Sequence, residues 1–190
     1  MKKIIVAVTG ASGSIIGYKL LQALKSMSDV ETHLILSKGA KKVLKAETNY
    51  EAEDFFSLAD FCYKEDDLAA LISSGSFKTA GMIVAPCSMK TLAAITCGYD
   101  ENLVVRAADV CLKENRRVVL IPREMPFSKA HLRNLLQAAN DGCAIIPPML
   151  TFYNDATTLD EQIDHIIGKA LMQFDIEYDK FKSWSGSLDK

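Results

Sequence analysis

Two short stretches of the chain have the residue types and spacing needed to act on a phosphorylated ligand. In the first, an apolar run of β-branched residues stops at Thr9, where the glycine-rich sequence TGASG begins. Backbone N–H groups of such a turn, together with the positive end of a following helix, bind anions. Ser12 and Ser14 add hydroxyl donors. We therefore predict a phosphate-binding turn here, although any tight turn from strand to helix favours glycine.

The second stretch is the sequence PREMP, which begins at Pro122 and follows another apolar run. Its two prolines restrict the backbone, so Arg123 and Glu124 are held in a stiff loop. Charged residues fixed in this way favour a binding or catalytic role over an ordinary surface turn. Glu124 is the candidate for acid–base chemistry. The simpler alternative is that Glu124 only pairs with Arg123.

Hydroxyl residues also stand at two other points where an apolar run gives way to a helical pattern. Ser37 follows the run 31–36, and the segment from Ser88 to Thr91 follows the run 81–85. Serine at a helix start caps the helix, and the same hydroxyl can face a ligand. Cys87 stands beside this segment, but no histidine is close to it in sequence, so we interpret it as a packing residue.

The elements that must position these residues alternate between strand and helix patterns. Strands are expected at 4–8, 31–36, 58–63, 81–85, 118–121 and 143–148, and helices at 15–27, 41–56, 68–72, 89–97, 102–115, 128–140 and 159–174. On the helix at 128–140, leucines 132, 135 and 136 are expected to be buried. This alternation predicts an α/β, three-layer Rossmann-like or flavodoxin-like fold, with a mainly parallel sheet and helices on both faces. The carboxyl ends of the strands then form one rim, where the site should lie.

The bulk composition is typical of a globular domain and excludes several classes. Of 190 residues, 49% are hydrophobic and 24% charged, which predicts one α/β domain at 1–174 and a loose tail at 175–190. The net charge of −2, without a Lys/Arg block, argues against nucleic acid as a partner. No apolar run predicts a signal peptide or a membrane span. Five cysteines without a CxxC pair argue against a metal site and favour a reducing cytoplasm.

Two common phosphate-containing ligands, a dinucleotide cofactor and ATP, fit the sequence poorly. The TGASG turn resembles that of short-chain dehydrogenases, but its last glycine falls one residue late. No acid follows the second strand, and the only Tyr-x-x-x-Lys spacing, Tyr178 to Lys182, lies in the tail. An ATP site of the Walker type lacks its Gly-Lys-Ser/Thr signature. A mononucleotide with one phosphate remains, and FMN fits the hydroxyl-rich turns best.

A resemblance to a known family rests on seven motifs at matching spacing. They are TGASG from Thr9, SK from Ser37, PCSMKT from Pro86, NLVVRAADV from Asn102, LKENR from Leu112, PREMP from Pro122 and FY from Phe152. Together they resemble the flavin prenyltransferases, which were once described as accessory subunits of 3-polyprenyl-4-hydroxybenzoate or aromatic-acid decarboxylases. The resemblance implies a metal-independent transferase. It would join a dimethylallyl group from dimethylallyl monophosphate to N5 and C6 of reduced FMN.

The same resemblance implies partners and assembly. The product, prenylated FMN, would serve a partner decarboxylase. The protein would form a large homo-oligomer, a dodecamer, with sites built between subunits. Two alternatives stay open: a flavin-dependent decarboxylase of peptidyl-cysteine type, and a non-catalytic FMN-binding accessory subunit. The first is disfavoured because PCSMK stands where that class carries PASAN and no matching histidine follows the first helix. A pyrophosphate donor also stays open.

Site residues carry over by position. The predicted FMN-binding set is Gly10, Ala11, Ser12, Ser37, Ser88, Met89, Lys90, Thr91, Arg106 and Arg123. The predicted dimethylallyl phosphate-binding set is Lys113, Arg123, Tyr153 and Lys169, with Lys169 where many members carry arginine. The predicted catalytic set is Glu124, Ser12 and Glu47 for proton handling, and Trp184 as a π surface for an allylic cation. A structural ion pair is the alternative for Arg106, and a solvated position is the alternative for Glu47.

Overall fold

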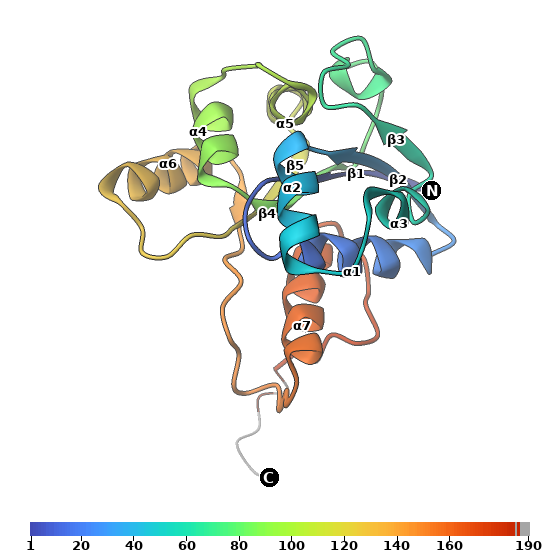
Figure 1. Cartoon of the computed structure of the whole chain (residues 1–190), viewed down its shortest axis with the longest axis vertical. Helices are drawn as coiled ribbons and strands as arrows, with labels where there is room; N and C mark the ends of the chain where they lie inside the picture. Colours follow the sequence, from blue (N-terminus) through green and yellow to red (C-terminus); the bar gives the residue numbers. More distant parts are fainter. Residues whose placement is uncertain (185, 187–190) are drawn as a thin grey trace.

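The computed structural model, which describes residues 1–184 and 186, contains a sheet of six strands that all run parallel (Figure 1). The strand order is β3-β2-β1-β4-β5-β6. The strands are β1 (Lys2–Val8), β2 (Val30–Leu36), β3 (Phe61–Tyr63), β4 (Gly81–Cys87), β5 (Arg117–Pro122) and β6 (Ala144–Ile145). The order changes direction between β1 and β4, the position at which open α/β sheets bind ligands.

Helices cover both faces of this sheet. They are α1 (Ser14–Lys25), α2 (Lys38–Glu47), α3 (Ala52–Phe56), α4 (Met89–Cys97), α5 (Leu103–Lys113), α6 (Lys129–Asn140) and α7 (Leu159–Met172), with a short 3-10 turn at Leu71–Ser73. Helices α1 and α7 pack on one face, against side chains such as Ile4 and Ile83. Helices α4 and α5 pack on the other face, against Ile5 and Met82 (Figure 1). The predicted three-layer α/β fold is confirmed.

Sequence patterns explain why these elements form. Strands buried on both faces read as continuous apolar runs, and residues 4–8 of β1 are all buried. Ser37 Oγ accepts a hydrogen bond from Ala40 N–H at 3.0 Å, and Ser88 Oγ accepts one from Thr91 N–H at 3.2 Å. Both predicted caps are therefore present. Each fixes the first turn of the helix that follows its strand.

The predicted single helix at 41–56 is wrong, because the chain breaks it into α2 and α3. Thr48 is extended, and its hydroxyl donates to the Leu44 carbonyl at 3.0 Å, which ends α2. A capping box between Glu51 and Asp54 then starts α3. Tyr50, inside the break, stacks on Tyr18 of α1 at a centroid distance of 4.0 Å. Local hydrogen bonds of Thr48 therefore compete successfully with helix continuation.

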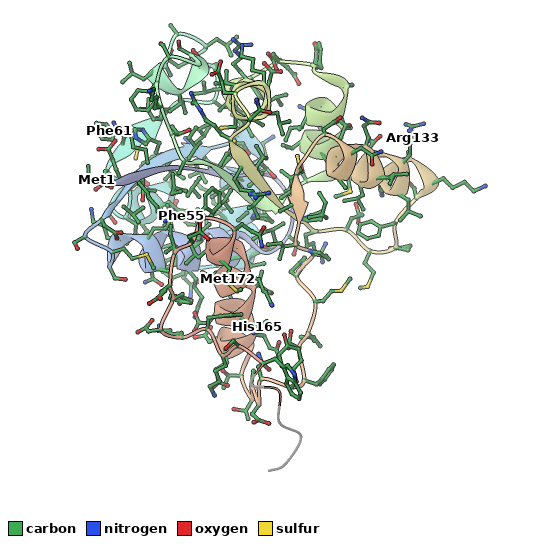
Figure 2. The ribbon with its side chains drawn as sticks, turned by 180° about the vertical axis from the view of Figure 1, so that it is seen from behind. Met1, Phe55, Phe61, Arg133, His165 and Met172 are labelled. Atoms are coloured by element: carbon green, nitrogen blue, oxygen red, sulfur yellow. The ribbon has the colours of Figure 1, made fainter. Side chains whose placement is uncertain are left out.

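Helix α6 departs from the prediction in its burial. Leu132 and Leu136 are 54% and 63% exposed, and Leu135 is only half-buried. The helix projects beside α4 rather than lying across the sheet, and Arg133 points away from the rest of the molecule (Figure 2). Strand β6 is also shorter than the predicted 143–148, since Pro147 and Pro148 have no N–H to donate to the sheet.

The chain after α7 packs back on that helix, so the prediction of a loose tail is wrong for its described part. Ile176 is buried, and the Tyr178 hydroxyl donates to Asp164 Oδ1 at 2.8 Å. Phe181 covers Gly168, where a Cβ atom would collide with its ring. The rest of the predicted tail, residues 185 and 187–190, lies outside the described residues.

Candidate active site

The carboxyl ends of β1, β2, β4 and β5 are joined by hydrogen bonds into the rim that the sequence predicted. The Thr9 hydroxyl donates to the Pro86 carbonyl at 2.7 Å and accepts from Ser88 N–H at 2.8 Å. Ser37 N–H donates to the Val8 carbonyl at 3.1 Å, and Arg123 N–H donates to the Cys87 carbonyl at 3.2 Å. Buried Thr9 therefore ties two loops of the rim together, a role that sequence analysis missed.

The glycine-rich turn after β1 lies close to the start of α2. A Cβ atom on Gly10 would stand 3.1 Å from Gly39 Cα, closer than most side chains can pack. Glycine at both positions lets the two loops touch. This contact brings the predicted FMN-binding residues of the first turn next to Ser37.

A carboxylate, that of Glu47, already fills the anion-binding position at the start of α1. Glu47 Oε2 accepts hydrogen bonds from Gly13 N–H at 2.9 Å and from Ser14 N–H at 3.4 Å. Burial alone would raise the pKa of Glu47, but bonds from the Ser12 hydroxyl and from Gly13 and Ser14 together lower it. Glu47 is therefore an anion at neutral pH. The N–H groups assigned to a phosphate serve this carboxylate instead, and the predicted pair Ser12 and Glu47 is brought together.

Helix α4 offers a second anion-binding position on the rim. The Ser88 side chain caps Thr91 N–H. Among the described residues, the N–H groups of Met89 and Lys90 have no acceptor, so they are open to a ligand. Helix α2 has less capacity, because Glu65 Oε2 accepts from Lys38 N–H at 2.7 Å. The start of α4 is thus the better position for a phosphate.

Arg123 and Glu124 lie side by side on the rim without an ion pair between them. Glu124 Oε1 accepts a hydrogen bond from Met125 N–H at 3.0 Å, and within the described residues neither side chain has an ionic partner. Both residues line a cavity of about 420 Å³ that Phe127 and Pro147 also border. The simpler alternative, a plain pair between Arg123 and Glu124, is therefore not what this structure contains.

Arg106 takes the structural alternative in this chain. Its guanidinium donates to Asp100 Oδ2 at 3.1 Å, to Asp109 Oδ2 at 3.0 Å and to the Ser73 carbonyl at 3.2 Å. These three contacts brace α5 against the loops on either side. A direct role of Arg106 toward FMN stays a prediction.

The four residues predicted to bind the donor phosphate do not meet within one chain. Lys113 ends α5, just before the start of β5, whereas Arg123 follows the carboxyl end of β5. The six residues of β5 separate its two ends by about 20 Å. Tyr153 and Lys169 belong to the α7 region, where Tyr153 meets Trp184 edge-on at a centroid distance of 5.7 Å. One small phosphate therefore cannot contact both Lys113 and Arg123 of the same copy.

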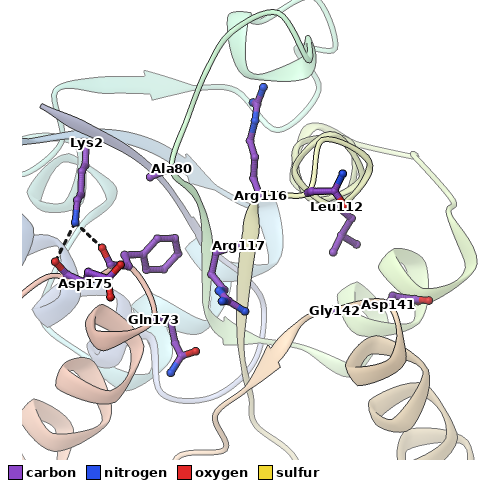
Figure 3. Close-up of a pocket in the computed structure, with 11 residues that line it drawn as sticks. Lys2, Ala80, Leu112, Arg116, Arg117, Asp141, Gly142, Gln173 and Asp175 are labelled. Atoms are coloured by element: carbon purple, nitrogen blue, oxygen red, sulfur yellow. Dashed lines mark hydrogen bonds between the residues drawn. The ribbon is translucent and has the colours of Figure 1, made fainter.

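A larger cavity, about 620 Å³, opens at the edge of the sheet away from the rim (Figure 3). Its lining includes Arg117, at the start of β5, and Lys2, at the start of β1. Lys2 Nζ donates to the carbonyls of Phe174 and Asp175 at 2.6 and 2.9 Å, which anchors the chain after α7. None of the predicted site residues lines this cavity, so size does not identify the site here.

Two further residues, Cys87 and His165, are buried and carry groups that could react. Burial raises the pKa of the Cys87 thiol, and this fully buried residue packs in the core as predicted. His165 on α7 is buried beside Tyr153, which the sequence analysis did not foresee. Its spacing of four residues from Lys169, on one helical face, was the signal available.

Three comparisons relate the chain to known proteins. The Flavoprotein family model matches residues 1–173. A probable UbiX-like flavin prenyltransferase of Sedimentibacter hydroxybenzoicus is 58% identical over 187 residues, covering 98% of this chain and 99% of the relative. The dodecameric FMN-dependent UbiX-like decarboxylase of Escherichia coli O157:H7 has a TM-score of 0.94 at 53% identity, covering 97% and 100% of the two chains. AnUbiX (PadA1), in complex with FMN and dimethylallyl pyrophosphate, has a TM-score of 0.95 at 47% identity, covering 98% of each chain.

Two properties of the described residues accompany these likenesses. No helix among residues 1–184 is both long and apolar enough to cross a bilayer, and no group of three or more His, Cys, Asp or Glu side chains there could hold a metal ion. The likenesses themselves extend over nearly the full length of every chain compared. The predicted resemblance is confirmed, and the chain belongs to the UbiX-like flavin prenyltransferase family of transferases.

Proposed function

We propose that this protein transfers a dimethylallyl group from dimethylallyl monophosphate to N5 and C6 of reduced FMN, which yields prenylated FMN. The observation that carries the proposal is the rim itself. Arg123 and Glu124 lie there in a stiff loop without an ion-pair partner among the described residues, beside a helix start that is open to a phosphate. AnUbiX, a relative of 47% identity, was crystallised with FMN and dimethylallyl pyrophosphate, which supports FMN and a dimethylallyl phosphate ester as the two ligands.

FMN binds on the rim in this proposal. Its phosphate lies at the start of α4, where Met89 and Lys90 offer N–H groups and Ser88 and Thr91 offer hydroxyls. Gly10, Ala11, Ser12 and Ser37 border the flavin from the β1 and β2 loops, and Arg123 and Arg106 complete the predicted set. Glu47 and Ser12, already in contact, handle protons at the flavin edge.

The donor phosphate binds to cations that come from more than one copy of the chain. Arg123 supplies one charge, Lys169 and the Tyr153 hydroxyl supply another group, and Lys113 reaches the site from a neighbouring subunit. Each charge-assisted contact contributes on the order of 1.5–3 kcal/mol and strengthens as the leaving phosphate gains charge. The protein is then a homo-oligomer, and the dodecamer of the E. coli relative is the proposed form.

The chemistry forms two bonds and releases one phosphate. N5 loses a proton and bonds to the allylic carbon as the C–O bond breaks. C6 then bonds to the tertiary carbon of the same unit, which requires one proton added to the alkene and one removed from C6. In this proposal Glu124, which lines the rim cavity, exchanges these protons through the released phosphate. Trp184, beside Tyr153, shields the allylic cation with its ring.

The test is anaerobic incubation of the protein with reduced FMN and dimethylallyl monophosphate, followed by mass spectrometry of the flavin. A gain of one C5H8 unit with release of inorganic phosphate is expected. Tight FMN binding without that gain would instead indicate an accessory subunit. Release of CO2 from a peptide with a C-terminal cysteine would indicate a decarboxylase. Parallel reactions with dimethylallyl pyrophosphate identify the preferred donor.

The proposal also includes a partner enzyme that uses the product and a cytoplasmic location for the protein. Prenylated FMN passes to a decarboxylase that uses it as cofactor. The five cysteines are all free thiols, as expected in the reducing cytoplasm of a cell.

A further inference from the structure

His165 is a buried titratable group next to Tyr153, a predicted ligand-binding residue. It is 5% exposed, and it lies on α7 at the end of the molecule where the chain folds back (Figure 2). Its Nε2 stands 3.4 Å from the Tyr153 hydroxyl, and the two rings meet edge-on at 5.7 Å. Its Nδ1 is buried and has no hydrogen-bond partner among the described residues. The ring is therefore held by one polar contact only, the contact with Tyr153.

The surroundings determine which protonation state His165 adopts. Burial, and then the charge of Lys169, lower its pKa below the ordinary histidine value, so the ring is neutral at neutral pH. The nearby carboxylate Asp164 is engaged by the Tyr178 hydroxyl. Lys180 and Lys182 border a small cavity that His165 also lines. Glu161, on the same cavity, accepts hydrogen bonds from Thr157 and Thr158. No carboxylate among the described residues bonds to the ring and stabilises an imidazolium.

A neutral imidazole has two tautomers, and the orphaned Nδ1 distinguishes them. A proton on Nδ1 would bury an N–H donor without an acceptor, which is rare in folded proteins. A proton on Nε2 leaves Nδ1 as an unpaired acceptor, which is less unusual. The Nε2–H tautomer then donates to the Tyr153 oxygen. The Tyr153 hydroxyl, whose oxygen is thus already an acceptor, keeps its own proton free to donate elsewhere.

We propose that His165 is a positioning residue that fixes the Tyr153 hydroxyl as a hydrogen-bond donor to the phosphate of the prenyl donor. The inference rests on the proposed function and adds a residue to it. Tyr153 is half exposed, and it is held between His165 on one side and Trp184 on the other, edge-on to both rings. Its hydroxyl therefore has one internal partner, and His165 decides the direction in which it donates.

The test compares Tyr153→Phe with four variants or combinations at His165. His165→Gln can place an amide N–H near the position of Nε2, whereas His165→Asn reaches only as far as Nδ1. His165→Phe keeps a ring without a polar atom, and Tyr153→Phe/His165→Phe closes a double-mutant cycle. Dimethylallyl monophosphate is titrated into oligomer loaded with oxidised FMN, which cannot turn over, and the dissociation constant is measured by calorimetry. The KM and kcat of prenyl transfer are measured separately with reduced FMN.

We expect Tyr153→Phe, His165→Phe and His165→Asn each to weaken donor binding by roughly tenfold or more. His165→Gln should restore binding to within about threefold of the parent protein. The double variant should bind no more weakly than Tyr153→Phe alone, because both changes remove the same contact. The KM for the donor should rise while the affinity for FMN stays unchanged.

Three results would overturn the inference. One is a His165→Phe variant that still binds FMN, keeps its oligomeric state and binds the donor as tightly as the parent protein does. Another is an equal loss in the Gln and Asn variants, which would mark a purely structural role. The third is additivity in the double-mutant cycle. These outcomes are separate from failure of the proposed function, which would appear as an absence of prenyl transfer in the parent protein.

Discussion

At the residue scale, Glu47 illustrates how one side chain changes the use of a familiar motif. A glycine-rich turn at a helix start usually offers its N–H groups to a ligand. Here the carboxylate of Glu47, from the end of α2, accepts the bonds from Gly13 and Ser14. The helix dipole stabilises this anion. The turn is consequently committed to holding a proton-accepting group beside Ser12, and the open anion site moves to α4.

Glu124→Gln tests the predicted acid–base residue. The amide keeps the size of the side chain but cannot exchange a proton, so we expect prenyl transfer to slow by about 10²–10⁴-fold. Glu53→Gln, an exposed change on α3, is the matched control and should leave the rate unchanged. The measurement is the rate of prenylated FMN formation, with FMN affinity recorded for each variant. Full product at an unchanged rate in Glu124→Gln would mean that Glu124 has no catalytic role.

His33→Phe tests a pH dependence of stability. His33 is buried in β2, with Nε2 2.9 Å from Glu31 Oε1 and Nδ1 2.9 Å from the Tyr63 hydroxyl. Burial lowers its pKa, and the contact with Glu31 only partly offsets this. The unfolded chain therefore binds a proton first as the pH falls below the ordinary histidine value of about 6.5. Stability should then fall between pH 7 and pH 5.

The change in the pH dependence of stability caused by His33→Phe separates the contribution of His33 from that of His165. Each proton bound only by the unfolded chain costs about 1.4 kcal/mol per pH unit, and both His33 and His165 have lowered pKa values. Removing His33 should flatten the curve by up to one such contribution. Urea unfolding at several pH values between 5 and 8 measures the slope. A curve parallel to that of the parent protein would show that His33 does not contribute.

At the element scale, Gly17→Ala tests the contact between α1 and the sheet. A Cβ atom at Gly17 would lie 2.5 Å from the Ala85 carbonyl oxygen and 2.8 Å from Val8 Cγ2. Overpacking of this kind costs about 1–3 kcal/mol, whereas alanine gains at most about 1 kcal/mol in helix propensity. We expect a net loss of roughly 1–2 kcal/mol in the free energy of unfolding. Gln22→Ala, exposed on the same helix, should stay neutral or stabilise, and equal stability in both variants would contradict the packing.

Elements were predictable where one local pattern determined them. Strands β1 and β4 are continuous apolar runs, and Ser37 and Ser88 cap helices within three residues, so all four were evident from sequence. The break in the helix at Thr48 was not, because the apolar spacing continues through it. Nor was the exposure of Leu132 on α6. Periodicity shows that a helix has an apolar face, but it does not show whether the same chain covers that face.

The candidate site divides in the same way. The rim was predictable because parallel strands bring their carboxyl ends to one edge. The contact of Ser12 with Glu47 joins the loop after β1 to the end of α2, and the pairing of Arg106 with Asp100 depends on how a loop folds back. The separation of Lys113 from Arg123 follows from β5 between them, a strand that the sequence predicted at 118–121. The sequence motifs therefore identified the candidate residues, and the packing of the elements determined which of them lie close together.

At the scale of the whole molecule, one chain leaves apolar side chains exposed and holds the predicted donor-binding cations Lys113 and Arg123 apart. Leu132, Leu136, Met125, Met149 and Phe152 are all more than half exposed. Arg123 lies near Met125 on the rim, and Tyr153 directly follows Phe152. A second copy that covered such surface would also bring its own cations to the rim. In the proposed function, the donor phosphate site is completed by assembly, and neither copy would hold it alone.

Subunit complementation tests this arrangement directly. Lys113→Ala and Arg123→Ala should each abolish most prenyl transfer, since each removes a cation from every site. In mixed oligomers, purified through two different affinity tags after co-expression, some sites combine Lys113 of one copy with Arg123 of another. Random assembly at equal amounts makes about one site in four intact, so about a quarter of parental activity should return.

The matched control pairs two lesions on the same loop. Arg123 and Glu124 are adjacent residues of one rim, so mixed oligomers of Arg123→Ala and Glu124→Gln contain no intact site and should stay inactive. Recovery in the first mixture but not in the second would place Lys113 and Arg123 of each site on different chains. Equal recovery in both mixtures, or none in the first, would contradict a site shared between subunits. The second of these results would require Lys113 to act from the far edge of its own sheet, which the length of β5 does not allow.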